Sequence, residues 1–195
     1  PGRRAPPARE VAEAMTLPQP ERGLCLILAR LLEYPGPQWP ETVSSCEEAL
    51  VELGGGRALR KEVALIQGFL QRVPQRTLGE WQELYVETFD FGRKVSLYWT
   101  ATLFGEERDR TRHPQRGYAL WQLQEIYRRY GYDLLEGELP DYLPALLEFV
   151  SQVGIPPELS RYMDVLQAAM KEASGKLREA ASPYEPLLAA AGSLL

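Results

Sequence analysis

Apolar residues recur at helical spacing over most of the chain. Between Leu24 and Leu177 they repeat three or four positions apart, which is the period of one buried helix face. The predicted core faces comprise Leu24, Ile27, Leu28, Leu31 and Leu32; Val43, Cys46, Leu50 and Leu53; Leu59, Val63, Ile66 and Leu70; Leu78, Trp81, Leu84, Tyr85 and Phe89; Ala119, Leu123, Ile126, Tyr127 and Tyr130; and Leu159, Met163, Leu166, Met170, Ala173 and Leu177. The aromatic stretch from Ser96 to Phe104 is also predicted to be helical. Because no convincing strand or repeat is present, the pattern predicts an all-α single domain of about eight or nine packed helices.

Capping residues mark where two of these helices begin. Thr77 and Glu80 have the spacing of a capping box, in which each residue bonds the backbone N–H of the other. Ser182 and Glu185 have the same spacing, and Pro183 is expected at the first position of the last helix. Both starts are therefore predicted from local sequence alone.

The stretch 138–149 combines an acidic loop with the start of an apolar helix. Asp141 is expected to cap the first turn, and Pro144 falls within that turn, where its missing N–H does little harm. The apolar face that follows is Leu143, Leu146, Leu147 and Val150. Residues 131–160 contain no lysine or arginine, and their carboxylates are Asp133, Glu136, Glu138, Asp141, Glu148 and Glu158. This asymmetry predicts attraction of a cationic partner, although an acidic first turn also suits any soluble helix.

The composition is that of a globular protein with an acidic balance. Of 195 residues, 45% are hydrophobic and 25% charged, and the net charge of -5 with a pI near 5.1 argues against nucleic acid as the main partner. Cys25 and Cys46 lie far apart and predict neither a disulfide framework nor a zinc site. No apolar run approaches the roughly 20 residues of a spanning helix, so we expect a cytoplasmic protein without direct membrane insertion.

The first 16 residues are polar and rich in proline. They predict a flexible N-terminal arm, residues 1–16, ahead of a single all-helical domain, residues 17–195. Arg3 and Arg4 suggest a twin-arginine export signal, but no apolar stretch follows them. Since the first methionine is Met15, the arm is either native or an artefact of the start site.

No catalytic constellation emerges from the chain. His113 is the only histidine and falls in an arginine-rich loop, where a solvated side chain is the expected interpretation. Glu138 and Asp141 are expected at an exposed helix start, without the apolar burial that would separate their pKa values. The glycines at 54–56 follow no strand and precede no Gly-Lys-Ser/Thr, so they predict a helix end and not a phosphate loop. We therefore expect no enzyme, no catalytic residue, no metal and no cofactor.

Three segments together resemble the NarJ-type assembly chaperones of respiratory nitrate reductase, within the wider TorD/DmsD group of redox-enzyme maturation proteins. These segments are Leu84–Asp90 continuing into Ser96–Tyr98, then Gly105–Arg110, then Glu138–Leu143 with Leu147–Phe149. With the helix pattern, the resemblance covers about Leu24 to Leu177. One departure is Tyr142, which replaces the histidine often found after the Pro-Asp pair, so a titrating imidazole at this position is in doubt.

The resemblance implies a TorD-like, cytosolic chaperone. It would bind the N-terminal segment of the apo catalytic subunit of nitrate reductase, hold it until molybdenum cofactor is inserted, and delay membrane docking until then. A basic amphipathic segment would place its cations against the acidic loop and its apolar face in a groove between helices. The resemblance leaves monomer and dimer open.

The residues assigned from this reasoning form two sets. Those expected to contact the peptide are Glu138, Pro140, Asp141, Tyr142, Leu143, Leu146, Tyr85, Phe89 and Tyr98. Those expected to have a structural role in the family motif are Thr88, Asp90, Ser96, Arg108, Asp109 and Arg110. Asp90 is expected to pair with Arg93 or Arg110. The aromatic residues of the first set have a competing interpretation as core residues.

Two alternatives remain open from the sequence. One is a maturation chaperone for another molybdoenzyme, of the DMSO or TMAO reductase type, which would share the fold and bind a different peptide. The other is a nucleotide-hydrolysing helical enzyme, which the absent phosphate loop and the single histidine disfavour.

Overall fold

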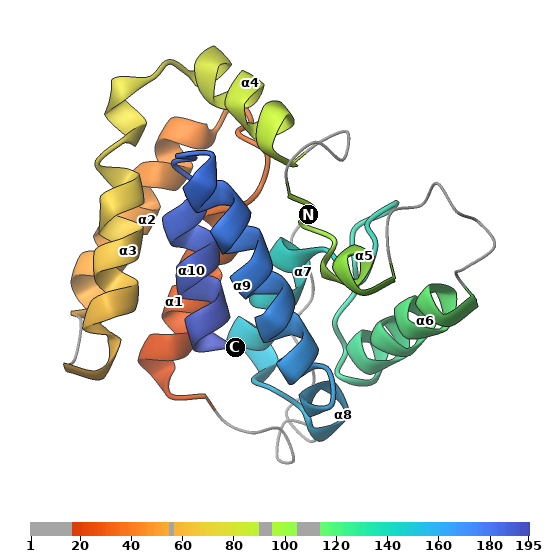
Figure 1. Cartoon of the computed structure of the whole chain (residues 1–195). Helices are drawn as coiled ribbons and strands as arrows, with labels where there is room; N and C mark the ends of the chain where they lie inside the picture. The colour runs from red at the N-terminus through yellow and green to blue at the C-terminus, as the bar shows by residue number, and fades with distance from the viewer. Residues whose placement is uncertain (1–16, 55–56, 90–94, 105–113) are drawn as a thin grey trace.

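The computed structural model describes residues 17–54, 57–89, 95–104 and 114–195, and these are mostly helical (Figure 1). The α-helices of the described ranges are α1 (Gln19–Leu31), α2 (Trp39–Leu53), α3 (Arg60–Leu70), α4 (Leu78–Phe89), α5 (Trp99–Phe104), α6 (Pro114–Arg129), α7 (Leu143–Val153), α8 (Pro157–Ser160), α9 (Met163–Glu179) and α10 (Glu185–Leu194). Short 3-10 helices, Arg57–Leu59 and Val73–Gln75, precede α3 and α4. No β-strand occurs within these ranges, so the all-α prediction is confirmed.

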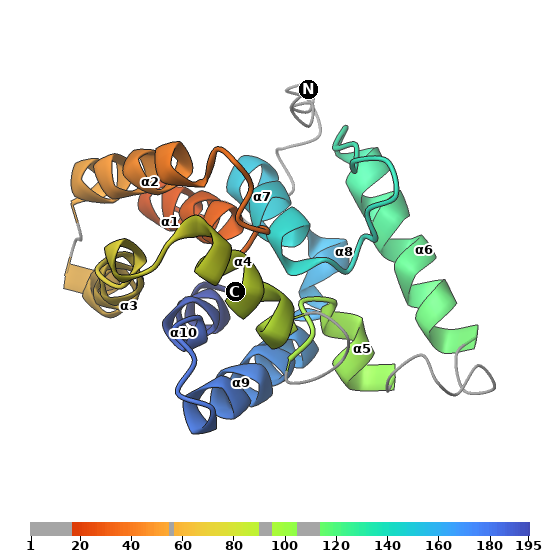
Figure 2. The same ribbon diagram turned by 90° about the horizontal axis from the view of Figure 1, so that it is seen from above.

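The helices α1, α7, α9 and α10 form the centre of the molecule (Figures 1 and 2). α1 packs along α7, and α10 lies between α3 and α9. α2 and α3 cover one side of this centre and α5 and α6 the other, while α4 passes over the end of α10 (Figure 2). The apolar faces predicted from the sequence point into this core, because burying them is the main gain in free energy on folding.

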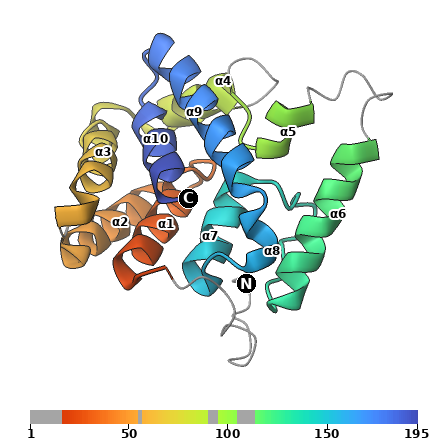
Figure 3. The ribbon, with the colours of Figure 1, turned by 60° about the horizontal axis from the view of Figure 1, so that its bottom comes forward.

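Most residues of the helix α7 are buried, and Figure 3 shows this helix between α1 and α8. All four residues of its predicted apolar face, Leu143, Leu146, Leu147 and Val150, have no exposed surface. The guanidinium of Arg22 on α1 donates to the carbonyl oxygens of Ser151 and Gln152 at the end of α7. Gly154 then ends the helix with φ of 92°, a conformation that glycine adopts without steric cost.

One predicted helix is divided in the structure. Leu159 belongs to the short helix α8, which follows Pro156, and α9 begins only at Met163. The described chain therefore has ten α-helices where about eight or nine are predicted, and the difference is a single turn. The apolar stripe itself is continuous, because Leu159 and Leu166 are both fully buried.

The two predicted capping boxes have different outcomes. At the start of α4 the Thr77 amide donates to Glu80 at 2.7 Å, and the Glu80 amide donates to the Thr77 hydroxyl at 3.3 Å, as predicted. The second box is wrong, because the N-cap of α10 is Tyr184 and it has no side-chain cap. Glu185 instead accepts hydrogen bonds from Arg178 and Ser174 on α9, so an interhelical contact replaces the local one.

Both cysteines, Cys25 and Cys46, are free and buried. Of the helices in the described part of the chain, none has the length and apolarity needed to cross a bilayer.

Candidate functional site

Backbone pairing joins two of the three motif segments. Tyr98 and Tyr142 form an isolated antiparallel bridge. The amide of Trp99 donates a hydrogen bond to the carbonyl oxygen of Asp141 at 3.1 Å. The amide of Leu143 donates one to the carbonyl oxygen of Leu97 at 2.8 Å. The start of α5 is thereby fixed against the start of α7, although more than 40 residues separate them in sequence.

Four tyrosines are linked at this junction by two ring contacts and one hydroxyl contact, and we call this group the aromatic ladder: Tyr34, Tyr85, Tyr142 and Tyr98. Tyr34 meets Tyr85 edge to face at 5.4 Å between ring centroids, and Tyr142 meets Tyr98 at 5.4 Å. The hydroxyl oxygens of Tyr85 and Tyr142 are 3.2 Å apart. The two ends of the ladder reach the surface, because Tyr34 is 51% exposed and Tyr98 is 39% exposed.

The hydroxyl hydrogen bonds of the ladder run in one direction. Tyr85 donates its only proton to the carbonyl oxygen of Leu32 at 3.1 Å. Tyr142 must therefore be the donor in its bond to Tyr85. This fixes the orientation of both phenol groups and ties the start of α7 to the end of α1.

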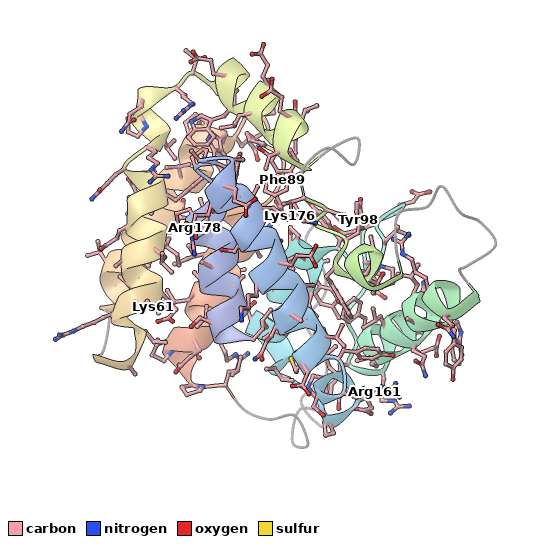
Figure 4. The ribbon with its side chains drawn as sticks, viewed as in Figure 1. Lys61, Phe89, Tyr98, Arg161, Lys176 and Arg178 are labelled. Carbon is pink, nitrogen blue, oxygen red and sulfur yellow. The ribbon has the colours of Figure 1, made fainter. Side chains whose placement is uncertain are left out.

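The predicted aromatic residues thus have different roles. Tyr85 is buried, and Phe89 is partly buried against Tyr85 and Tyr184. Figure 4 labels Phe89, at the end of α4, and Tyr98, just before α5. Of the four predicted aromatics, Tyr98 is the one that is exposed at the surface. Tyr85 is buried and contacts Tyr34 and Tyr142.

Tyr142 is a neutral phenol at physiological pH. Burial raises the pKa of its hydroxyl to about 12, and the nearby carboxylates of Glu33 and Glu138 contribute to the increase. A histidine at this position would titrate near neutral pH, but this side chain does not. The two carboxylates also show that negative charge lies close to the aromatic ladder.

The predicted placement of Asp141 is wrong. It does not cap α7, whose N-cap is Tyr142 without a side-chain bond, and it is not at an exposed helix start, since it has no exposed surface. Its Oδ2 instead accepts a hydrogen bond from the Thr100 hydroxyl and pairs with the Arg116 guanidinium at 3.2 Å. Arg116 also donates to the Thr100 hydroxyl at 3.1 Å. A buried charge needs such partners, and α5 and α6 supply them.

Other residues expected to contact a peptide are also internal. Leu143 and Leu146 have no exposed surface and belong to the core, and Pro140 is buried with its carbonyl oxygen bonded by Tyr127 at 2.9 Å. Glu138 is half-buried, and its Oε2 accepts a hydrogen bond from the amide of Leu135 at 3.3 Å. The periodicity that identified the helix face could not show that α1 would pack along α7 and help to cover it.

The residues assigned to structural roles are only partly described. Thr88 is buried, donates to the carbonyl oxygen of Leu84 at 2.6 Å, and bonds Val95 through its own carbonyl. Ser96 accepts a hydrogen bond from the amide of Tyr98 at 3.1 Å, which holds the turn before α5. The remaining predicted positions, Asp90, Arg93, Arg108, Asp109, Arg110 and His113, lie outside the described residues.

Sequence reasoning missed three residues at this site. Glu33 and Tyr34 follow α1, and an exposed aromatic beside an acidic residue just before the Pro35 break was the available signal. Arg116 gave no signal, because one arginine among several on a charged stretch is not distinguished by its spacing. Among the described residues, no group of three or more His, Cys, Asp or Glu side chains is arranged to hold a metal ion.

The sequence comparisons identify the family. A family model described as nitrate reductase delta subunit matches residues 56–190, a range that contains all three motif segments. The chain belongs to the nitrate reductase delta subunit family. This match confirms the resemblance found in the motif segments, and it begins after α2.

Individual relatives are similar to this chain over 130 to 175 residues. A relative from Bacillus subtilis (strain 168), described as a probable nitrate reductase molybdenum cofactor assembly chaperone NarJ, is 31% identical over 161 residues, which cover 83% of this chain and 82% of the relative. NarJ of Escherichia coli K12, described as a chaperone of the same kind, is 35% identical over 130 residues, covering 66% of this chain and 51% of the relative. NarW of that strain, described as a probable chaperone of this kind, is 29% identical over 175 residues, or 87% of this chain and 68% of the relative. The match to Escherichia coli NarJ therefore spans about half of that protein.

Proposed function

We propose that this protein is a nitrate reductase molybdenum cofactor assembly chaperone and not an enzyme. Relatives that cover most of the chain are described as such chaperones, and this observation carries the proposal. The client is the apo catalytic subunit of a respiratory nitrate reductase. The chaperone binds the client's N-terminal segment and holds it for cofactor insertion before the enzyme docks at the membrane.

The aromatic ladder and its carboxylates are the proposed contact surface for that segment. Tyr34 and Tyr98 offer exposed rings at its two ends, and Glu33 and Glu138 place negative charge near its middle. Aromatic rings bind both apolar side chains and cations, and the carboxylates favour a basic segment. Asp141 supports this surface from below by holding Tyr142 in place.

Calorimetric titration with a peptide of the client's N-terminal segment tests the proposal. We expect binding that weakens as salt is added, because part of the attraction is between exposed charges. Removing one ring or one charge, as Tyr98→Ala or Glu138→Gln, should weaken binding by about tenfold or less. Glu138→Gln keeps an oxygen that accepts the Leu135 amide and so removes only the charge.

Matched controls separate contact from general effects. Tyr118→Ala removes another exposed tyrosine, on α6, and Glu179→Gln removes an exposed charge at the end of α9. Both should leave binding unchanged. Equal affinity for the N-terminal segments of DMSO or TMAO reductases would favour the alternative client, and no heat with any of these peptides would overturn the proposed interaction.

A further inference from the structure

A groove of about 550 Å³ lies between α1 and α2, outside the aromatic ladder. Leu26, Ile27, Cys46 and Ala49 provide its apolar lining, and Thr42 and Ser45 provide hydroxyls along its α2 wall. Leu26 is 40% exposed and so presents apolar surface at the groove. Figure 2 shows the two helices running side by side at the edge of the molecule.

The α2 wall of this groove is acidic. The helix contains four glutamates and no lysine or arginine, and these residues are Glu41, Glu47, Glu48 and Glu52. All four are exposed, and Glu41 lines the groove directly. An apolar floor beside an acidic helix, with Glu41 at its wall, is complementary to a helix with one apolar and one basic face.

One ion pair links the groove to the aromatic ladder. Arg30 lines the groove and lies 3.5 Å from Glu33, which precedes Tyr34 of the ladder. Arg30 also lies 3.5 Å from Glu148 on α7, so two carboxylates hold its charge. With two carboxylates beside one cation, the junction keeps a net negative charge and does not repel a basic segment.

We propose that the groove between α1 and α2 binds the apolar side chains of the client's amphipathic N-terminal segment. The inference rests on the proposed function and adds a second, apolar subsite to the aromatic ladder. Apolar residues of the segment at positions i, i+3 or i+4, and i+7 enter the groove, and its cations face the carboxylates of α2. Binding to both subsites makes the recognised segment longer than one helical turn.

Two adjacent serines provide a matched test by obstruction. Ser44 and Ser45 are both exposed on α2, but only Ser45 lines the groove. In calorimetry with the client peptide, Ser45→Trp should weaken binding by about tenfold or more, because the indole fills the space that the apolar side chains need. Ser44→Trp should stay within about twofold of the parent protein, since it adds the same ring outside the groove.

A fluorescence measurement keeps the test independent of that substitution. A thiol-reactive dye on Ser45→Cys should shift its emission when peptide is added, and the same dye on Ser44→Cys should not. Cys25 and Cys46 are buried, and burial raises the pKa of Cys46 to about 11, so the introduced thiol reacts first. Unchanged emission together with normal binding by Ser45→Trp would overturn the inference.

The outcomes distinguish the inference from the proposed function. If the parent protein binds the peptide and Tyr98→Ala weakens it, but both tryptophan variants bind normally, the ladder is a contact site and the groove is not. If the parent protein binds no client peptide at all, the proposed function fails first. A weakening by Ser44→Trp equal to that by Ser45→Trp would indicate a general effect of the ring and would also count against the groove.

Discussion

The carboxylate of Asp141 connects three elements that are distant in sequence. It belongs to the segment just before α7, its hydrogen-bond donor Thr100 is on α5, and its ion-pair partner Arg116 is on α6. Asp141 has no exposed surface and the Arg116 side chain is only 12% exposed, so solvent does little to screen the pair. The next residue, Tyr142, is part of the aromatic ladder, so the buried pair positions the proposed contact surface.

At the residue scale, we predict that Asp141→Ala destabilises the protein strongly. The change leaves the Arg116 charge buried without its partner, and the free energy of unfolding should fall by about 3–5 kcal/mol. Urea unfolding followed by circular dichroism measures this loss. The control Glu125→Ala removes half of an exposed pair with Arg128 and should cost less than about 1 kcal/mol.

The double variant Asp141→Ala with Arg116→Met sharpens this test. Removing both charges should restore part of the lost stability, because no unpaired charge remains buried. Losses that simply add in the double variant would show that the two side chains are not coupled.

At the scale of elements, α7 differs from the other helices because it has almost no solvent face. Its residues from Leu143 to Val150 are all buried, including the charged Glu148, which lies near Arg30. A helix surrounded on all sides cannot offer its leucines to a partner. It acts as the scaffold on which the loop from Glu138 to Tyr142 is held.

We predict that Leu146→Ala lowers stability without lowering the affinity for the client peptide. Loss of a fully buried leucine leaves a cavity and should reduce the free energy of unfolding by about 2–5 kcal/mol. The same substitution at Leu26, which is 40% exposed, should cost less than about 1 kcal/mol. Urea unfolding measures the loss of stability. Peptide calorimetry, at a temperature where both variants are folded, measures the affinity. Weaker binding by folded Leu146→Ala would contradict the scaffold role of α7.

At the scale of the whole molecule, several weak acids are buried in their neutral form. Burial raises the pKa of Cys25 to about 12, of Cys46 to about 11 and of Tyr142 to about 12, and it raises those of Tyr85 and Tyr184 as well. In the unfolded chain, the pKa of a thiol is about 8.5 and that of a phenol is about 10. The folded protein therefore holds these protons more tightly than the unfolded chain.

We predict that stability falls in alkaline solution. Because the pKa values of these thiols and phenols are raised in the folded state, the protonated groups stabilise the fold fully below about pH 8.5. This stabilisation is lost as the pH rises towards about 12, because the unfolded chain releases these protons first. Urea unfolding at a series of pH values from neutral to alkaline measures the decline. Cys46→Ala should make the decline between about pH 8.5 and 11 less steep, and an equally steep decline in this variant would rule out Cys46 as a cause.

The sequence predicts the fold better than it predicts the candidate site. The faces of α1, α6 and α9 and the capping box of Thr77 and Glu80 are predicted from sequence because their signals come from residues within a few positions of one another. The binding assignments of Asp141, Leu143 and Leu146 conflict with their full burial. Of the predicted contacts, Tyr98 is exposed and Glu138, Tyr142 and Phe89 are half-buried, while Tyr34 and Glu33 were not predicted at all.

The sequence by itself determined the helical class, most of the helix faces and, through the three motif segments, the family. These properties depend on short-range periodicity and on the identity of the residues. Only the tertiary structure decided that Glu138 lies at the surface while Asp141, three residues later, lies beneath α5 and α6. Both are acidic residues of one short loop, so their local sequence is nearly equivalent. Their burial depends on Thr100 and Arg116, which the chain brings to Asp141 only when it folds.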